Sequence, residues 1–489
     1  MRLKLKKFEV STGRPIAFIN HDDAEKADIG VGERVQISKK KLKIQARVDV
    51  ASNFIKKGEI ALTDDILAYL LAKPGEHIEV TLMPSPRSSP FITKKMNGGR
   101  LSKKEIRAII DDVINNALSE AEISEFIVGV YRNGMNDEET VGLTEAMCMT
   151  GERLHWRAKV IADKHCIGGI AGNRTTPIVV SICAAAGLVM PKTSSRAITS
   201  AAGTADVIET VSSVDFSAAE LQRIVQKTGA CLAWGGSLGL APADDKLIRI
   251  ERTLRLDPDS QLIASILSKK IAAGSTHVLI DIPYGEGAKV TKQRAQTLKE
   301  NFLKVGKRFG LTMRVLLTDG SQPIGDGIGP VLEMIDALKV LHNREPPRDL
   351  QKKSLRLAGE IIELVGVRRK GEGIKLAREM LFSGAAAKKF EEIVNAQGRK
   401  NSSLEPGHLK RKIAANKTGR IIHIDNEKIN RLATVLGCPT DKGAGIYLYK
   451  HVGDSVKKGE PAMTLYAHSQ ERLHEGVRNL EEHNPMKIA

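Results

Sequence analysis

One irregular stretch of the chain reads Lys192-Thr193-Ser194-Ser195-Arg196-Ala197-Ile198-Thr199-Ser200-Ala201-Ala202-Gly203-Thr204-Ala205-Asp206. It combines hydroxyl side chains, one arginine and small residues, a composition that no amphipathic helix requires. A loop that wraps backbone N–H groups and hydroxyls around an oxyanion does require it. A second stretch of this kind, Asp163–Pro177, lies upstream and is rich in glycine and threonine. Two such loops in one domain predict a bound phosphate that takes part in chemistry.

The sequence around both loops has the pattern of an α/β domain. Val278–Ile282 and Met313–Leu317 are short apolar runs, typical of strands buried on both faces. They alternate with helical stretches, which predicts a mostly parallel sheet. Thr176 is expected to cap a helix that has Pro177 at its first position, where a missing N–H costs nothing.

The remainder of the chain predicts three further parts. Residues 1–83 alternate apolar and polar side chains, as in Ile78–Leu82, and are expected to form a β-rich domain. Residues 84–150 are expected to form a small helical lobe, completed by about 240–274. Its helix starts are marked by three capping boxes, Ser102/Glu105, Ser119/Glu122 and Asn136/Glu139.

The larger α/β lobe is expected to comprise residues 151–239 and 275–415, followed by a C-terminal α+β domain over 416–489. In this last domain Gly453–Pro461 is similar to the turn of lipoyl-like barrel-sandwich domains, although no lysine there has a convincing context for such a cofactor. Glu481–Ala489 is expected to fray. The fold class is therefore multidomain α/β and α+β.

Composition and charge limit the classes of function that the chain can have. The formal net charge is +17, and aromatic residues make up only 4% of the chain. The basic clusters Lys39–Lys41, Arg368–Lys370 and Lys410–Lys412 are scattered and not interleaved with aromatics, so an anionic substrate explains the charge better than nucleic acid does. The longest apolar run, about Pro177 to Met190, is too short to span a bilayer. We expect a soluble, cytoplasmic protein.

The cysteines give no sign of a zinc site or a disulfide framework. There are five, with no CxxC pair. Cys166 stands beside His165, but neighbouring side chains in an extended loop point apart, which disfavours a thiol nucleophile. Histidines are dispersed and no carboxylate cluster has ligand spacing, so we expect neither metal nor cofactor.

Both loops resemble the thymidine phosphorylase family of nucleoside phosphorylases. The KHS-x-GG motif of that family stands here as Lys164–Gly169, and its longer signature matches Ser194–Glu209. The resemblance extends over about residues 95–480. It is greatest to the archaeal AMP phosphorylase branch, which has an extra N-terminal domain that residues 1–83 fit. Further matches are Leu240–Asp244, Ala264–Lys270 and Leu317–Asp319.

The resemblance implies phosphorolysis of AMP by inorganic phosphate to adenine and ribose 1,5-bisphosphate, with no cofactor. Asp257 matches the position of an aspartate that protonates the leaving base. Ser265 and Lys269 are expected near the base or ribose, and a homo-oligomer is expected. Which loop holds which phosphate stays open. The expected phosphate-binding residues are Lys164, Gly168, Gly169, Ser194 and Thr204 for the nucleophile, and Arg196, Thr199, Ser200 and Lys289 for the 5′-phosphate, with Ser195, Ala197 and Ile198 completing the loop.

Two departures from the family pattern leave alternatives open. Ile250 aligns with an arginine that contacts the base in pyrimidine-specific members, which favours a purine unless Arg249 or Arg252 takes its place. Cys166 stands where many relatives have serine, and a thiol is a weaker donor. A pyrimidine nucleoside phosphorylase, a phosphoribosyltransferase without its acidic magnesium site, and a nucleic-acid binder without turnover are the alternatives. Selectivity among AMP, CMP and UMP is not predicted.

Overall fold

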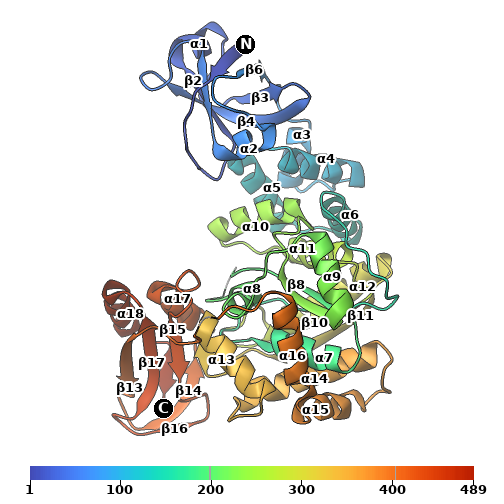
Figure 1. Ribbon diagram of the computed structural model, residues 1–489, viewed down its shortest axis with the longest axis vertical. Helices are drawn as coiled ribbons and strands as arrows, with labels where there is room; N and C mark the ends of the chain where they lie inside the picture. The colour runs from blue at the N-terminus through green and yellow to red at the C-terminus, as the bar shows by residue number, and fades with distance from the viewer. Residues whose placement is uncertain (198–199, 402) are drawn as a thin grey trace. The chain divides into compact units, whose positions relative to one another are not determined.

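The computed structural model describes residues 1–197, 200–401 and 403–489 (Figure 1). The chain forms two compact units, which are described separately. One comprises Met1–Thr150 and Pro242–Ala264, and the other Gly151–Ala241 and Ser265–Ala489. The predicted fold class is confirmed, with a helical part, a mostly parallel α/β part and β-rich domains toward both ends of the chain.

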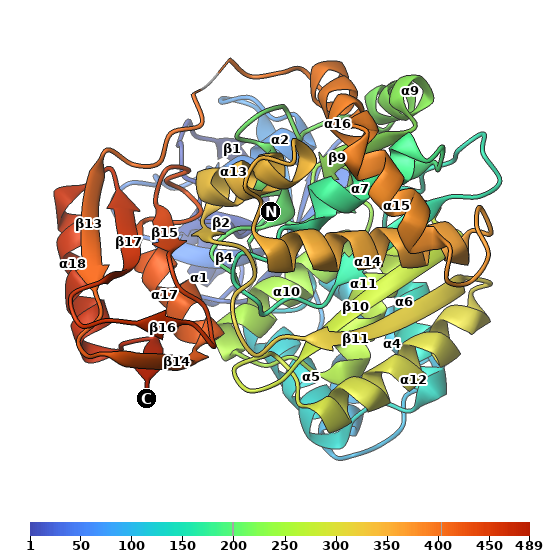
Figure 2. The ribbon, with the colours of Figure 1, turned by 90° about the horizontal axis from the view of Figure 1, so that it is seen from below.

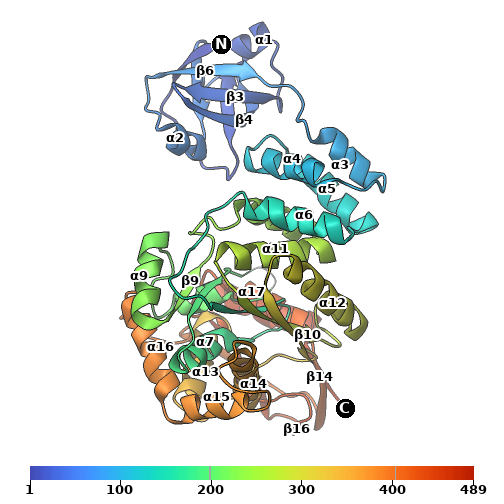
Figure 3. The same cartoon turned by 90° about the vertical axis from the view of Figure 1, so that its right-hand side faces the viewer.

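The first unit begins with a closed six-stranded barrel in the order β1-β5-β2-β4-β3-β6 (Figure 3). Alternate residues point inward along the strands, as the sequence pattern predicts. β3 begins at Arg34, directly after a turn in which Gly32 adopts a φ of +82°. The elements are β1 (Arg2–Leu5), β2 (Ile16–Asn20), α1 (His21–Lys26), β3 (Arg34–Lys39), β4 (Leu42–Ala51), β5 (Glu59–Leu62), α2 (Asp64–Leu70) and β6 (His77–Leu82).

The helical part of this unit confirms all three predicted capping boxes, at Ser102, Ser119 and Asn136. Each box satisfies two backbone N–H groups that the first helical turn leaves without partners. The apolar faces meet in one core that includes Ile106 and Phe126, both fully buried. The helices are α3 (Ser89–Met96), α4 (Lys103–Ile114), α5 (Glu120–Asn133), α6 (Asp137–Cys148), α10 (Pro242–Leu254) and the first turns of α11 (Asp259–Ala272).

The second unit contains the predicted parallel sheet. Its strands run in the order β11-β10-β7, with β10 (His277–Tyr284) parallel to both β7 (Ala162–Cys166) and β11 (Thr312–Asp319). A second parallel pair joins β8 (Met190–Ser194) to β9 (Ala230–Trp234), next to β7 through the hydrogen bond from Ala162 N to the Val189 carbonyl. The surrounding helices are α7 (Thr175–Ala185), α8 (Thr204–Ile208), α9 (Ala218–Thr228), α12 (Lys292–Arg308), α13 (Pro330–Leu341), α14 (Arg348–Leu364), α15 (Gly373–Phe382) and α16 (Ala385–Ala396).

The end of the chain forms a sheet of order β12-β15-β17-β13 and a smaller sheet β16-β14-β18, with two helices (Figure 2). The expectation that the last residues fray is wrong. β18 pairs with β14, and Arg420 and Ala489 exchange two backbone hydrogen bonds of 2.8 Å. The elements are β12 (Gly327–Ile328), β13 (Leu409–Ala414), β14 (Gly419–Ile424), α17 (Asn426–Leu436), β15 (Gly445–Leu448), β16 (Ser455–Val456), β17 (Pro461–Ala467), α18 (Gln470–Glu482) and β18 (Met486–Ile488).

Candidate active site

The two predicted anion loops follow the carboxyl ends of parallel strands, where ligands bind in open α/β sheets. The first loop, residues 167–174, comes after β7, and the second, residues 195–203, comes after β8. Arg174 joins the two loops. Its guanidinium donates to Glu333 Oε2, Thr204 Oγ1 and the Ala202 carbonyl, each at 2.7 Å. The segments that the sequence predicts to act on phosphate are therefore fastened to one another.

Lys164 lies on β7, three residues before the first loop, and is 1% exposed. Its ammonium donates to Thr175 Oγ1 at 2.7 Å and to Thr176 Oγ1 at 3.2 Å. The predicted N-cap at Thr176 is wrong, since α7 already begins at Thr175 with Arg174 as its N-cap. The threonine hydroxyls are used to hold the lysine instead of capping the helix, and Pro177 is tolerated in the first turn.

Gly168 and Gly169 both have a φ of +90°, a backbone conformation that side-chain-bearing residues rarely adopt. A Cβ at Gly169 would lie 2.9 Å from Lys289 Cβ, so the loop after β10 packs directly on the first anion loop. Lys289 Nζ is 3.5 Å from the Ile167 carbonyl. The structure thus brings three predicted site residues together from two strand ends.

The surroundings of β7 are strongly cationic. Burial lowers the pKa of Lys164 to about 8, and nearby Lys353 and Arg174 act in the same direction while Cys166 and Asp281 oppose them. Burial also lowers the pKa of His165 well below its usual value, with Lys270, Lys192 and Lys269 adding to the effect. A bound anion would reduce the repulsion between these cations. A cluster of buried cations of this kind is typical of an anion-binding site.

Two buried aspartates partly offset these cations. Asp163 accepts from Lys270 at 2.8 Å and from Ser275 Oγ at 3.0 Å. Burial raises the pKa of Asp163, but the charges of Lys270 and Lys192 outweigh it and lower the pKa overall. Asp281 lies 3.0 Å from Lys353 Nζ and accepts from Thr318 at 2.6 Å. These pairs fix the strands beneath the loops.

Asp206 organises the second loop. Its Oδ2 accepts the N–H groups of Ala197 and Gly203, at 2.7 and 2.9 Å. A Cβ on Gly203 would lie 2.3 Å from the Arg196 carbonyl carbon, so only glycine allows the two ends of the loop to come this close. One buried carboxylate thereby holds Ala197 and Gly203 close together.

The other predicted residues of this loop have varied surroundings. Ser194 Oγ is buried and has no hydrogen-bond partner among the described residues, whereas Ser195 is exposed. Ser200 Oγ donates to the Ala202 carbonyl at 2.7 Å, and Thr204 accepts from Arg174. A buried hydroxyl without a partner in an anion loop suits a ligand oxygen. The predicted positions Ile198 and Thr199 lie outside the described residues.

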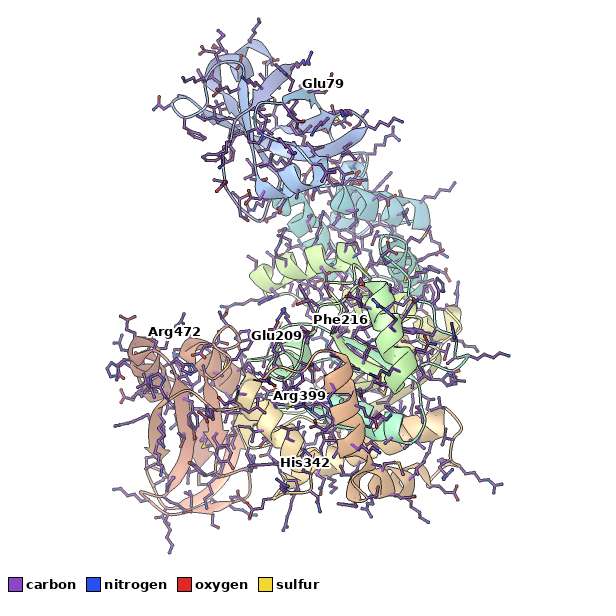
Figure 4. The ribbon with its side chains drawn as sticks, viewed as in Figure 1. Glu79, Glu209, Phe216, His342, Arg399 and Arg472 are labelled. Carbon is purple, nitrogen blue, oxygen red and sulfur yellow. The ribbon has the colours of Figure 1, made fainter. Side chains whose placement is uncertain are left out.

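Arg196 is already engaged by acidic partners. Its guanidinium makes two hydrogen bonds of 2.8 Å with Glu209 and one of 3.2 Å with Asp206. It also stacks on Trp234, with 4.7 Å between its Cζ and the ring centroid. The hydrogen bonds to Glu209 raise the pKa of Arg196 above its usual value. Figure 4 labels Glu209, directly after α8.

Cys166 is a poor nucleophile in this setting. Burial raises the pKa of its thiol, and the charge of Asp281 acts in the same direction. Asn173 Nδ2 lies 3.3 Å from its sulfur. The residue therefore stays a protonated thiol at neutral pH, which agrees with setting a thiol mechanism aside.

The remaining predicted residues are divided between the two units. Asp257 lies between α10 and α11 in the first unit, partly exposed. Ser265 and Lys269 follow on α11 in the second unit, and Lys269 is near enough to His165 to influence its pKa. Ile250 packs in the core of the helical part, so it carries no information about a bound base. Arg249 donates to the Gly13 carbonyl at 3.0 Å.

Sequence reasoning missed several residues that build the site. Arg174 was inside the first predicted loop, and its position between Asn173 and Thr175 was the only sign of a role. Lys353 comes from α14, far along the chain, and no local pattern connects it with β10. The sequence pattern assigns Thr176 to helix capping, a commoner use of such residues, and gives its neighbour Thr175 no role.

Three family models match the chain. Residues 89–151 match the helical bundle domain of a glycosyl transferase family, and residues 158–387 match its α/β domain. Residues 421–487 match the pyrimidine nucleoside phosphorylase C-terminal domain. An AMP phosphorylase of Thermococcus sibiricus is 44% identical over 100% of this chain and 98% of its own length. The chain belongs to the thymidine phosphorylase family of nucleoside phosphorylases.

Other similar proteins of this family carry two different names. An AMP phosphorylase of Pyrococcus horikoshii is 45% identical, covering 100% of this chain and 98% of its own. A putative thymidine phosphorylase of Tolumonas auensis is 45% identical, covering 86% of this chain and 83% of its own. This chain, as a member of the same family, is a pentosyltransferase.

Anthranilate phosphoribosyltransferase from Thermus thermophilus shares the fold, with a TM-score of 0.52 and 18% identity over 63% of this chain and 98% of its own. Among the described residues, no helix has the length and apolar character needed to cross a membrane. Within the same part of the chain, no group of three or more His, Cys, Asp or Glu residues could hold a metal ion.

Proposed function

We propose that the protein catalyses phosphorolysis of AMP by inorganic phosphate, giving adenine and ribose 1,5-bisphosphate. The observation that carries the proposal is the pair of anion loops, fastened together by Arg174 beside the buried ammonium of Lys164. The names of the relatives support AMP as the nucleotide. A nucleotide and inorganic phosphate together bring two phosphate groups, and the chain offers two loops joined by the cation Arg174.

In this reaction one phosphate oxygen forms a bond to C1′ of the ribose, and the bond from C1′ to N9 of adenine breaks. The electron pair of the broken bond stays with the base. Phosphate is already a nucleophile, so the main task of the protein is to hold it in line with C1′. Lys164, Ser194 and the amides of Gly168 and Gly169 are proposed to hold it. The proposal requires no metal or organic cofactor.

Adenine departs more easily when a proton reaches N7 as the bond breaks, and we assign this proton to Asp257. The assignment rests on the family resemblance. Asp257→Asn is expected to lower kcat for AMP by about 10²–10⁴-fold with little change in KM. Asp259→Asn, two residues away at the start of α11, is the matched control.

7-Methyl-AMP tests this assignment separately, because its base already carries a positive charge and leaves without a proton. Asp257→Asn is expected to cleave 7-methyl-AMP at a rate near that of the wild type. An equal loss on both substrates would show that Asp257 supports the site in another way, and an effect confined to Asp259→Asn would move the role to Asp259.

The overall proposal is tested with purified protein and AMP, with and without inorganic phosphate, by following the release of adenine. CMP, UMP, adenosine and thymidine are assayed in parallel. Phosphate-dependent cleavage of AMP, with little cleavage of adenosine, is expected. Turnover of thymidine alone would favour the second candidate, a pyrimidine nucleoside phosphorylase, which the name of the Tolumonas auensis relative suggests. Comparable rates with CMP or UMP would widen the substrate range to nucleoside monophosphates.

A further inference from the structure

Both anion loops reach out of the α/β lobe into the C-terminal domain. Ala171 of the first loop and Ala201 of the second are 0% and 1% exposed, and both belong to the hydrophobic core of that domain. Their methyl groups pack in one cluster with side chains of α17 and β15, including Leu436 and Ile446. Each loop is thus anchored by one alanine in the core of the C-terminal domain, which follows the loops by more than two hundred residues.

The backbone at each anchor is held by one asparagine of α17. Ala171 N–H donates to Asn426 Oδ1 at 3.1 Å, and Ala201 N–H donates to Asn430 Oδ1 at 2.9 Å. Residues four apart lie on the same face of a helix, so one face of α17 serves both loops. Figure 1 shows α17 in the C-terminal domain. Asn426 Nδ2 also donates to the Gly320 carbonyl, just after β11, at 3.0 Å.

Neither helix stability nor packing in the hydrophobic core explains why asparagine stands at these two positions of α17. Asparagine is a poor helix former, and an apolar residue would suit a buried position better. Yet Asn426 and Asn430 are 0% and 5% exposed. Asn430 Nδ2 is even buried without a hydrogen-bond partner among the described residues. Their side-chain oxygen atoms explain the arrangement, because they accept hydrogen bonds from loop amides that would otherwise be buried without a partner.

A third link comes from Lys442, between α17 and β15. Its ammonium lies 2.9 Å from Glu209 Oε2 and 3.3 Å from Asp206 Oδ1. Asp206 is the carboxylate around which the second loop turns. The C-terminal domain therefore contacts that loop both at Ala201 and at its organising acid.

We propose that α17 is a positioning element for the reaction, with Asn426 and Asn430 setting the spacing of the two anion loops. The asparagines act through the loop backbones and are not assigned any contact with reacting atoms. A phosphate held by the amides of Gly168 and Gly169 in the first loop and by the hydroxyl of Ser194, where the second loop starts, requires their separation to be fixed to within a fraction of an ångström. The inference rests on the proposed function, because it assumes that these loops bind phosphate.

The test replaces Asn430 by leucine, which keeps the size of the side chain and removes the acceptor. Asn430→Asp is the conservative variant, since a carboxyl retains an oxygen for Ala201 N–H, and Asn426→Leu tests the first loop. Leu436→Ala is the matched control, because it opens a cavity in the same core without touching either loop hydrogen bond. Calorimetry measures the binding of inorganic phosphate, assays give KM for each substrate and kcat, and thermal unfolding shows that each variant folds.

Asn430→Leu and Asn426→Leu are expected to weaken phosphate binding tenfold or more. Asn430→Asp and Leu436→Ala are expected to bind within threefold of the wild type, even where Leu436→Ala unfolds at a lower temperature. The inference is overturned if both leucine variants bind phosphate normally, or if Leu436→Ala weakens binding as much as they do. A wild-type protein that binds phosphate but cleaves no nucleotide would refute the proposed function alone, because the binding comparison still decides the role of α17.

Discussion

The two anion loops differ in how the charge of a nearby cation is surrounded. Beside the first loop, the cation Lys164 is held by two threonine hydroxyls and has the cations Lys353 and Arg174 nearby. In the second loop the cation, Arg196, is bound by Glu209 and Asp206 and stacked on Trp234. The sequence gives both residues the same expected role as phosphate ligands. Their surroundings in the folded chain differ in sign.

The pKa directions express this difference. Burial lowers the pKa of Lys164 to about 8, whereas hydrogen bonds to Glu209 raise the pKa of Arg196. A cation whose charge is disfavoured in the free protein gains most when an anion arrives, while a cation already paired gains little. We therefore propose that Lys164 is poised to bind a ligand and that Arg196 is part of the scaffold of its loop.

The largest expected effect comes from Lys164→Met, which removes the ammonium and keeps an unbranched apolar side chain. Loss of a buried charge-assisted contact to phosphate is expected to lower kcat/KM by about 10²–10³-fold. The variant is expected to unfold at the same temperature as the wild type or higher, since it no longer buries a disfavoured charge. Steady-state kinetics and thermal unfolding measure the two effects. Retained activity would show that Lys164 does not bind the phosphate, and the contrast drawn with Arg196 would then be wrong.

Asp206→Ala is expected to have the next largest effect, of a different kind. It removes the acceptor for the amides of Ala197 and Gly203 and one partner each of Arg196 and Lys442. A buried N–H such as that of Gly203, left without an acceptor, typically costs ~1–3 kcal/mol, while Arg196 and Lys442 both keep Glu209 as a partner. We therefore expect a clear loss in the free energy of unfolding together with a fall in kcat/KM of about 10–10²-fold. Denaturant unfolding and kinetics on the same preparation check both.

A full loss of activity in Asp206→Ala with unchanged stability would mean that this carboxylate acts on a ligand and not on the loop. Ser217→Ala, which removes an exposed helix cap after the loop, is a suitable control for a general loss of stability in this region.

The third prediction concerns pH. Lys164 is protonated below its pKa of about 8 and loses its charge as the pH rises through that value. KM for inorganic phosphate is therefore expected to increase above about pH 8, toward tenfold for each further pH unit. A bound phosphate favours the charged amine, so the break in kcat should lie at higher pH than the break in kcat/KM. In Lys164→Met the break near pH 8 should be absent; its persistence there would assign it to another group.

The sequence was informative where one loop supplies several signals at once. The glycines at 168 and 169 and the signature from Ser194 to Glu209 located both loops, and capping boxes located three helix starts. It could not show that Arg196 faces Glu209, because acidic residues in the signature are equally compatible with a free arginine. The partners Glu333, Lys353 and Asn430 come from distant elements, and only the fold brings them to the loops.

The two errors at the level of local structure have the same origin. Thr176 has the residue type of a cap, but the buried ammonium of Lys164 competes for its hydroxyl and that of Thr175, and the helix begins earlier. The last residues lie at the end of the chain, where fraying is common, but an edge of β14 pairs with them as a strand. In both cases a tertiary partner that the sequence does not reveal overrides the local preference.

The smallest expected effect, and the one that sharpens the comparison most, is that of Arg196→Met. If Arg196 is scaffold, the variant should lose about 1–2 kcal/mol of unfolding free energy, because Glu209 retains Lys442 as a partner. KM for AMP should then rise less than fivefold. If Arg196 instead holds the 5′-phosphate, KM for AMP should rise about 10²-fold or more, while cleavage of adenosine, which lacks that phosphate, should not change. Measuring the ratio of kcat/KM for AMP to that for adenosine separates the two roles, since a distorted loop lowers both values and a lost phosphate contact lowers only the first.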